Sequence, residues 1–213
     1  MENTHIPSGL YEKYIKRPMD VILSMAALAA LSPLMAVIAV TVRIKLGSPI
    51  IFIQKRPGKN GKIFNNYKFR TMTEERDGNG NLLPDDVRLT SFGKKLRETS
   101  LDELPELFNI IKGDMSLIGF RPPLTYHPWP IEQYTEEQMK MFSVRPGVTG
   151  WAQVHGRKEV QWADRIEMGI WYAEHVSFLL DLKILILTVI KVLTNANNEN
   201  TVLTTGNGTI EKK

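Results

Sequence analysis

The sequence predicts a mostly helical α+β protein that combines a re-entrant membrane helix, interfacial amphipathic helices and a small cytoplasmic domain with a short β-hairpin. Three observations support this fold class: an apolar run at 21–42, two short β-type runs between 50 and 69, and apolar residues at helical spacing in 100–112 and 177–194. The chain of 213 residues suits one compact domain in addition to the membrane segment. It contains no cysteine, which excludes a disulfide framework and a thiolate metal site.

The apolar run 21–42 has Ser32-Pro33 at its middle and basic residues on both sides. At about 1.5 Å per residue it reaches about 33 Å, enough to cross a hydrocarbon core of about 30 Å. A helix that crosses has one Lys/Arg-rich cytoplasmic end, whereas here both ends are basic. Because Pro33 lacks the helical N–H and Ser32 offers a hydroxyl to a freed backbone group, we predict a helix–break–helix that dips into one leaflet and returns. A single crossing helix with a proline kink is the alternative.

Three segments follow from this pattern. Residues 1–46 form a polar tail and the re-entrant helix, residues 47–194 form a cytoplasmic and interfacial domain, and residues 195–213 form a polar tail that is predicted to be disordered. Inside the middle segment, turn residues at 56–61 predict a hairpin, and Gly113 ends a helix over 100–112. Further predictions are a polar loop at 74–86, extended chain at 120–130, helices at 135–142 and 161–174, and an irregular glycine-bearing segment at 143–158.

The segment 177–194 carries Ser177, Asp181, Thr188 and Lys191 on one helical stripe of an otherwise apolar body. A narrow polar stripe of this kind predicts a helix that lies in the plane of the membrane interface. A buried amphipathic helix of the protein core is an equally good interpretation of the same pattern.

The net charge of +4 hides an uneven distribution, since residues 12–70 carry +9 and the remainder carries −5. A basic block around a membrane segment indicates anionic lipid headgroups, at about 1 kcal/mol per Lys or Arg near the surface. It also attracts anionic substrates such as nucleotides and lipid phosphates. We expect no nucleic-acid partner, because the charge lies beside the apolar run and no nucleic-acid-binding motif is present.

Asp102 and Glu103 are adjacent carboxylates at the start of a predicted helix. A carboxylate beside phosphates can hold Mg²⁺ or attack phosphorus, and two adjacent carboxylates can divide these roles. The structural alternative is a capping box, in which Ser100 and Glu103 satisfy the first backbone N–H groups of the helix. From these residues alone the capping interpretation is favoured.

Several arginines stand near this pair or in segments interrupted by proline and glycine. Arginine binds phosphate oxygens through paired hydrogen bonds, and glycines let the backbone approach a phosphate closely. The sequence lacks the G-x-x-x-x-G-K-[ST] loop and a G-x-G-x-x-G turn after a strand, so neither of these nucleotide-binding folds is predicted. A surface salt bridge is the alternative role of each arginine. The arginines concerned are Arg97, Arg121, Arg145 and Arg157.

The motifs occur in an order that resembles a known family. They are the apolar run with LSP, FIQKRPGKNGKIFNNYKFRTM, TSLDELPELFNIIKGDMSLIGFRP, VRPGVTGWAQVHGR and SFLLDLKILILT. Over about residues 10–194 the chain closely resembles the bacterial sugar transferases that are small monotopic phosphoglycosyl transferases. This resemblance favours the catalytic interpretation of Asp102 and Glu103 over the capping interpretation.

By position, the resemblance implies that Asp102 and Glu103 are the family's catalytic pair and its Mg²⁺ ligands, and that Ser32-Pro33 is its membrane-helix break. The family's Pro-Arg-Pro element, which is associated with the nucleotide, falls on 120–122, where Phe120 replaces the first proline. His155 stands where the family usually has asparagine. The substrate-binding residues are then predicted at Arg97, Arg121, Pro122, Arg145, Gly147, Thr149, Gln153 and Arg157.

The implied reaction is UDP-sugar plus polyprenol (undecaprenyl) phosphate giving polyprenol diphosphate sugar and UMP, with an N-acetylated sugar favoured. Asp102 attacks the β-phosphorus, and the lipid phosphate then attacks the sugar-phosphoryl aspartate, while Glu103 deprotonates the acceptor or positions Mg²⁺. Such an enzyme lies monotopically on the cytoplasmic face of a bacterial inner membrane, begins a glycan assembly pathway and supplies downstream glycosyltransferases. The alternatives are a galactose- or glucose-phosphate transferase of the same family and a non-catalytic membrane scaffold.

Overall fold

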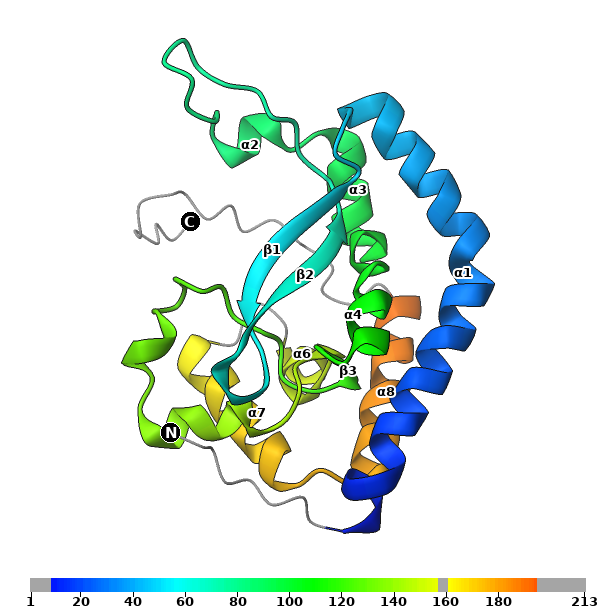
Figure 1. Ribbon diagram of the computed structural model, residues 1–213, viewed down its shortest axis with the longest axis vertical. Coiled ribbons are helices and arrows are strands. Elements are labelled where there is room, and N and C mark those ends of the chain that lie inside the picture. Colours follow the sequence, from blue (N-terminus) through cyan, green and yellow to red (C-terminus); the bar gives the residue numbers. More distant parts are fainter. Residues whose placement is uncertain (1–8, 157–160, 195–213) are drawn as a thin grey trace. The chain divides into compact units, whose positions relative to one another are not determined.

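The computed structural model describes residues 9–156 and 161–194, so the predicted tail at 195–213 lies outside the described residues. The chain divides into two compact units, which we describe one at a time. Of the described residues, unit 1 contains 9–32, 53–67 and 105–194 without 157–160, and unit 2 contains 33–52 and 68–104. The mostly helical α+β class that the sequence predicts is confirmed, with small two-stranded sheets among the helices (Figure 1).

One long helix carries the apolar run. After a π-helical turn, η1 (Tyr11–Ile15), helix α1 extends over Lys16–Leu46 with Pro33 inside it. The structure differs here from the predicted pair of separate arms, because the helix continues through the proline. Pro33 leaves the Ala29 carbonyl without its usual helical donor, and the Ser32 hydroxyl donates to that oxygen at 2.9 Å. The boundary between the two units falls at the same place, and the re-entrant course of α1 stays a prediction.

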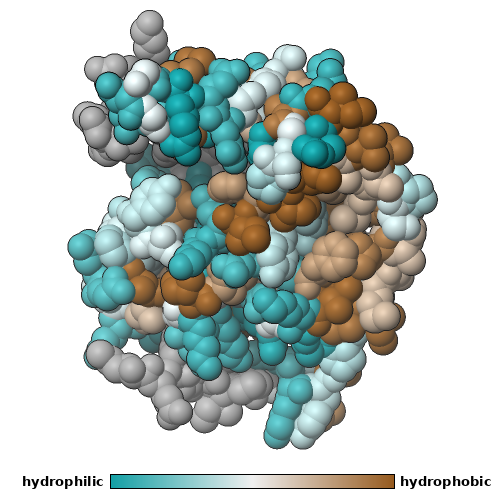
Figure 2. All heavy atoms as spheres, turned by 45° about the horizontal axis from the view of Figure 1, so that its top comes forward, coloured by the Kyte–Doolittle hydropathy of each residue, from teal (hydrophilic) through white to brown (hydrophobic). Residues whose placement is uncertain are grey.

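Helix α1 is apolar and exposed along most of its length. Together with η1 it is the one helix, within the described ranges, that is long and apolar enough to cross a membrane, and 11% of its most apolar stretch is buried. Figure 2 shows hydrophobic side chains gathered on the right of the view, the side on which Figure 1 draws α1. An apolar helix that the protein leaves uncovered is typical of a segment in contact with lipid.

Strands β1 (Ile51–Pro57) and β2 (Ile63–Phe69) form the predicted hairpin. The connecting turn, η2 (Lys59–Gly61), has left-handed backbone at Asn60 and Gly61, with φ of 56° and 73°. Asparagine and glycine adopt this region at the lowest cost, so the turn forms where the sequence predicts it.

Unit 1 is built around a main apolar core and a smaller apolar cluster that includes Ile110 and Met115. Two short strands, β3 (Ser116–Ile118) and β4 (Gly147–Thr149), pair in parallel, with Ser116 opposite Gly147 and Ile118 opposite Thr149. Buried side chains of the core include Phe120, Phe142 and Tyr172. The remaining elements are α4 (Glu106–Lys112), η4 (Ile131–Gln133), α5 (Glu136–Met139), η5 (Lys140–Ser143), α6 (Trp151–Gly156), α7 (Trp162–Glu174) and α8 (Phe178–Leu193).

The segment predicted to be irregular, 143–158, contains β4 and α6 within its described residues 143–156, and its last two residues lie outside the described part of the chain. Strand β4 pairs with β3, which is distant in the sequence, and no local pattern marks so short a strand. Its glycines are needed for close backbone approach, since a Cβ on Gly150 would lie 1.7 Å from the carbonyl oxygen of Gly119. In contrast, the helices predicted at 135–142 and 161–174 are present as α5 with η5 and as α7.

Helix α8 buries Asp181 of its polar stripe and leaves much of its apolar body exposed. Asp181 is 1% exposed, whereas Leu179 is 76% exposed. The buried Asp181 carboxylate accepts hydrogen bonds from Lys16 Nζ at 2.6 Å and from the Tyr172 hydroxyl at 2.7 Å. Ile184 of the same helix is fully buried in the core of unit 1, whereas most other apolar side chains of α8 are exposed, so the interfacial placement of the segment 177–194 stays a prediction.

Unit 2 packs the C-terminal part of α1 against α3 (Ser91–Glu98) and the ends of the hairpin strands. The Arg70 guanidinium closes the C-terminal end of α1, donating to the carbonyl oxygens of Leu46 and, at 2.7 Å, of Ser48. The predicted polar loop at 74–86 is present and largely exposed, and it leads into α2 (Asp85–Arg88). The core of this unit contains Val42, Leu46, Phe69 and Leu96.

Candidate active site

Asp102 and Glu103 lie in a 3₁₀ turn, η3 (Leu101–Glu103), that follows α3 in unit 2. Ser100 precedes this turn in the left-handed region, with φ 57° and ψ 17°, and its side chain makes no capping hydrogen bond. The capping-box interpretation is therefore wrong. The backbone N–H of Glu103 donates to the backbone oxygen of Ser100 at 3.2 Å, and the Glu103 carboxylate is directed elsewhere.

The helix predicted over 100–112 is divided into η3 and α4. Pro105 stands between them and has no N–H to donate to the carbonyl of Leu101, so η3 does not continue as regular α-helix. The C-terminal end is confirmed, because Gly113 caps α4 in the left-handed region with φ 105°. The two carboxylates thus stand on a short turn.

Lys68, which the sequence analysis missed, is the partner of Glu103. Its Nζ lies 2.6 Å from Glu103 Oε1, and the two side chains are 13% and 12% exposed. A short charge-assisted bond between largely buried groups fixes the carboxylate in one position. The sequence feature that could have identified Lys68 is a lysine within a strand that is otherwise apolar or amide-rich, because a half-buried charge needs a partner.

Asp102 is also buried, at 8% exposure, and faces positive charge. Burial lowers the pKa of Arg97, and the negative charge of Asp102 opposes that shift, so the two side chains interact electrostatically. Nε of Arg97 donates to the Thr71 hydroxyl oxygen at 3.0 Å, which orients the guanidinium. A nearby cation favours the ionised form of a carboxylate, and the ionised form is the nucleophile.

The same two carboxylates fit the predicted Mg²⁺. Among residues 9–156 and 161–194, no three His, Cys, Asp or Glu side chains are grouped so as to hold a metal ion by themselves. Mg²⁺ is usually held by one or two carboxylates together with substrate phosphates and water. Asp102 and Glu103 therefore provide a suitable donor set for an ion that arrives with a nucleotide.

In unit 1 the structure brings together two predicted binding segments that are distant in the sequence. Arg121 and Pro122 follow the carboxyl end of β3, and Thr149 ends the parallel strand β4. A backbone hydrogen bond from Gly147 N to Phe120 O, at 2.9 Å, joins the segments. Ligands of α/β proteins commonly bind at the carboxyl ends of parallel strands, and Arg121 is exposed there.

Other predicted binding residues have structural contacts. Nε of Arg145 donates to the carbonyl oxygen of Gly113 at 3.0 Å, at the C-terminal end of α4. A Cβ on Gly147 would lie 2.1 Å from the backbone nitrogen of Gly119, so strand packing requires this glycine. Phe120, which replaces the family's proline, is buried and packs edge-on against Phe142 at 5.1 Å. Arg157 lies outside the described residues.

Gln153 and Thr149 differ in how their polar atoms are satisfied. Gln153 is 8% exposed, and within the described part of the chain neither amide atom has a hydrogen-bond partner. Buried polar atoms without partners are uncommon and are often completed by water or a ligand. The Thr149 hydroxyl, in contrast, lies 2.7 Å from the Thr188 hydroxyl of α8.

Comparisons with known proteins identify a family and several relatives of this chain. Residues 11–195 match the family described as bacterial sugar transferase. The chain is 48% identical over 187 residues to the uncharacterized sugar transferase EpsL of Bacillus subtilis (strain 168), with 88% of this chain and 91% of that protein covered. It is 38% identical over 199 residues to the UDP-N-acetylgalactosamine-undecaprenyl-phosphate N-acetylgalactosaminephosphotransferase of Aeromonas hydrophila, with 89% and 46% covered.

A further relative is the UDP-glucose:undecaprenyl-phosphate glucose-1-phosphate transferase of Xanthomonas campestris pv. campestris, 40% identical over 183 residues, with 82% of this chain and 38% of that protein covered. The chain therefore spans less than half of the length of the two relatives that are named after their substrates, and most of the length of EpsL. Because the family match extends from the start of η1 to just beyond the end of α8, the chain belongs to the bacterial sugar transferase family.

Proposed function

We propose that this chain transfers a sugar 1-phosphate from a UDP-sugar to undecaprenyl phosphate, giving undecaprenyl diphosphate sugar and UMP. The names of two longer relatives support this reaction, since both name undecaprenyl phosphate with a UDP-sugar. One observation on this chain carries the proposal: two adjacent carboxylates stand on a short turn, each with a cation nearby. This arrangement suits phosphoryl transfer through a covalent intermediate.

In the proposed mechanism a carboxylate oxygen of Asp102 attacks the β-phosphorus of the UDP-sugar. A bond forms between that oxygen and phosphorus, and the bond from the β-phosphorus to the bridging oxygen breaks, so UMP leaves with the bonding electrons. A phosphate oxygen of undecaprenyl phosphate then attacks the same phosphorus and releases the Asp102 carboxylate. Two successive steps avoid bringing the nucleotide and lipid phosphates together at the same time.

Glu103 is proposed to handle the acceptor proton or to hold Mg²⁺ together with Asp102. Its ion pair with Lys68 fixes one carboxylate oxygen and keeps the side chain in place while substrates exchange. Mg²⁺, when bound, supplies positive charge that offsets the repulsion between anionic groups. Arg97 is proposed to bind a substrate phosphate, and its guanidinium interacts electrostatically with Asp102.

We place the enzyme monotopically on the cytoplasmic face of a bacterial inner membrane, with α1 as a re-entrant helix. Lys16, at the start of α1, donates to the carbonyl oxygen of Ile118 at 3.1 Å, so this end lies on the same side of the membrane as Ile118. The chain between Gly47 and Ile118 contains no apolar helix that could cross, so the other end of α1 lies on that side too. This connectivity supports a helix that enters and leaves by one leaflet.

Helix α8 supports the same placement. Its exposed side chains are mainly apolar, while Asp181 of its polar stripe is buried in unit 1. A helix of this kind is suited to lie at the headgroup boundary with its apolar face in the acyl chains. The enzyme would then act where the lipid phosphate is located, and its product would pass to downstream glycosyltransferases.

The donor is proposed to carry an N-acetylated sugar. The relatives' names include N-acetylgalactosamine, glucose and galactose, so UDP-glucose and UDP-galactose are the alternative donors. All three classes share the UDP-sugar and undecaprenyl phosphate chemistry that the carboxylate pair would serve.

The test is UMP release by the full chain, purified in detergent with Mg²⁺, over a panel of UDP-sugars with and without undecaprenyl phosphate. We expect lipid-dependent UMP release with at least one donor and none from Asp102→Asn. The same donor turned over equally by Asp102→Asn would disprove the nucleophile. Folded protein that releases UMP from none of the donors would favour the non-catalytic scaffold.

A further inference from the structure

The same short pattern, a tryptophan followed four residues later by a histidine, occurs twice in unit 1. Helix α6 carries Trp151 and His155, and the C-terminal end of α7 carries Trp171 with His175 directly after the helix. In each pair the histidine Nδ1 lies close to the tryptophan carbonyl oxygen, at 2.9 Å and 2.8 Å. A carbonyl oxygen only accepts, so Nδ1 donates and each imidazole is fixed beside its indole.

The four rings form one stack between α6 and α7. Trp151 and Trp171 stack on each other with ring centroids 4.7 Å apart. His155 lies 3.8 Å from Trp151, centroid to centroid. His175 stacks on Trp171 at 4.5 Å, and two rings stacked this closely cannot share one face of that indole. Neither face of Trp171 is therefore open for a sugar or a base, although the residue is 37% exposed.

Lys183 of α8 joins this stack. Its Nζ lies 5.3 Å from the Trp151 ring centroid. Lys183 is exposed and stands between exposed apolar side chains on the same helix face, since Leu179 precedes it by four residues and Ile186 follows it by three. Across the described residues no carboxylate pairs with Lys183, and Asp181 of the same helix pairs with a lysine of α1 instead. A cation thus stands within an apolar face and beside indoles.

We infer that Lys183 and the Trp151–Trp171 stack form a surface that binds the headgroup of an anionic phospholipid, with the lipid phosphate as the counterion of Lys183. This inference rests on the interfacial placement of α8 in the proposed function and extends that contact to α6 and the C-terminal end of α7. Indoles gather at headgroup depth because their rings are apolar and their N–H groups are polar. A lysine there lays its apolar stem along the helix and extends its charge to the anionic lipid.

Undecaprenyl phosphate also presents a phosphate, so the source of the ligand has to be assigned. We assign it to a phospholipid of the bilayer. A reacting phosphate would have to meet the proposed nucleophile, and Lys183 has no carboxylate paired with it among the described residues. The surface therefore holds a lipid that is not consumed.

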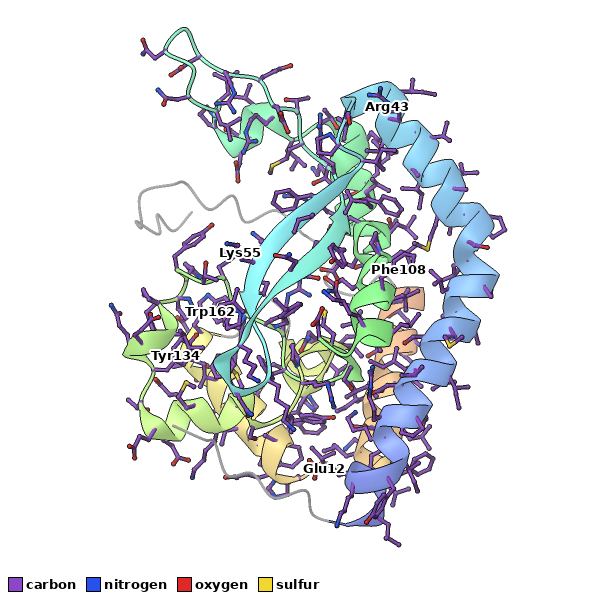
Figure 3. The ribbon with its side chains drawn as sticks, in the orientation of Figure 1. Glu12, Arg43, Lys55, Phe108, Tyr134 and Trp162 are labelled. Carbon is purple, nitrogen blue, oxygen red and sulfur yellow. The ribbon has the colours of Figure 1, made fainter. Side chains whose placement is uncertain are left out.

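The first test asks whether the stack reaches the membrane. The full chain is placed in phosphatidylcholine vesicles whose acyl chains carry bromine near the headgroup, because bromine quenches tryptophan emission on contact. The chain has four tryptophans, and the quenched fraction should fall about threefold or more in Trp151→Phe/Trp171→Phe. The matched control is Trp129→Phe/Trp162→Phe, which should keep the quenching. Trp162, labelled in Figure 3, begins α7, and Trp171 lies about 13 Å further along that helix.

The second test asks whether Lys183 selects anionic lipid. Brominated phosphatidylglycerol and brominated phosphatidylcholine are compared at equal mole fraction, and the anionic lipid should be enriched at the tryptophans about threefold to fivefold, as expected for one basic residue. Lys183→Met should remove this preference, and Lys183→Arg should retain it. Lys191→Met is the control, since it removes the same charge about 12 Å further along α8 and should leave the preference unchanged.

Three outcomes would overturn the inference. Equal loss of quenching in the two tryptophan double variants, or no quenching in the wild type, would show that the stack only joins α6 to α7. A preference that survives Lys183→Met would remove Lys183 from the site. Displacement of brominated phosphatidylglycerol by a small mole fraction of undecaprenyl phosphate would assign the phosphate to the carrier.

These measurements need no turnover, so their failure is distinct from failure of the proposed reaction. UMP release by the wild-type chain in detergent tests the reaction separately. Lys183→Met should keep that rate within about twofold, because detergent replaces the bilayer and Lys183 lies outside the proposed catalytic pair.

Discussion

The proposed catalytic pair in unit 2 and the arginines near the carboxyl end of β3 in unit 1 differ in the sign of the neighbouring charge. In unit 2, each carboxylate of the proposed catalytic pair has a cation nearby: Glu103 is bonded to Lys68, and Asp102 interacts with Arg97. In unit 1, burial and then the positive charge of Arg121 lower the pKa of Arg165, so two like charges act on each other there. Paired charges fix side chains without any ligand, whereas a like-charged group gains stability when an anion binds. We therefore expect the carboxylates of the proposed catalytic pair to be held in place by the protein before any substrate binds.

The largest effect should follow from removing the nucleophile. With UDP-sugar and no lipid, the wild-type chain should release UMP in a burst close to one per enzyme, because the sugar phosphate stays on Asp102. Asp102→Asn should show no burst and at least about 10³-fold slower turnover, since no covalent intermediate forms. Rapid-quench measurement of UMP gives the amplitude, and UDP binding confirms that the variant is folded. A full burst from Asp102→Asn would place the nucleophile elsewhere.

The second-largest expected effect tests whether the Lys68–Glu103 ion pair contributes to turnover. Lys68→Met removes the partner that lies 2.6 Å from Glu103, so kcat should fall about 30- to 100-fold, corresponding to about 2–3 kcal/mol. In Glu103→Gln, kcat should fall by a similar factor. The kcat of the double variant should be little lower than that of either single variant, because both substitutions remove the same contact. Steady-state UMP release by the wild type, the two single variants and the double variant measures the coupling energy between Lys68 and Glu103.

The control for this cycle is Lys94→Met, which removes an exposed lysine of the same unit whose nearest carboxylate is 3.9 Å away. It should leave kcat unchanged, because exposed ion pairs contribute little. Strictly additive losses in Lys68→Met and Glu103→Gln would mean that the ion pair does not position Glu103.

A smaller effect is expected from salt concentration, which should change KM for the UDP-sugar more than kcat. Raising NaCl from about 50 to about 300 mM should raise KM for the UDP-sugar several-fold, because binding of an anion at an exposed cationic group is screened. The same change should alter kcat by less than twofold, since the Lys68–Glu103 pair is largely buried. Arg121→Gln should flatten the salt dependence of KM. A salt-sensitive kcat with a constant KM would reverse the roles assigned to the two units.

Much of the scaffold could be predicted from the sequence, because it depends on local chemistry. The hairpin turn at Asn60-Gly61, the cap at Gly113 and the polar stripe of α8 each need only neighbouring residues. Strands β3 and β4 could not be predicted, since three-residue strands show no period and are formed by pairing with distant chain. Even α1 continues through Pro33 because the Ser32 hydroxyl replaces the missing donor.

The candidate site was predicted only in part, for the same physical reason. Asp102 and Glu103 are adjacent in the sequence and carry a family motif, whereas Lys68 reaches its partner Glu103 only after folding. The capping box failed because Ser100 adopts left-handed backbone, a conformation that the pattern S-x-x-E does not reveal. Long-range charge contacts are thus the part of this site that needed a structure.

The smallest expected effect concerns the hydrogen bond between Arg97 and Thr71, which orients the guanidinium that interacts with Asp102. Thr71→Val keeps the shape of the side chain but removes the oxygen that accepts from Arg97 Nε at 3.0 Å. Thr71 is buried, so losing this bond should destabilise the protein by about 1 kcal/mol and lower Tm by about 2–4 °C. The turnover number should fall only a few-fold, because the charge of Arg97 remains. Thr99→Val is the control, since the Thr99 hydroxyl bonds only within its own helix end, to Lys95 O at 2.8 Å and Leu96 O at 3.1 Å. If both variants lose turnover equally, the position of Arg97 does not matter to Asp102, and its charge alone supports the carboxylate.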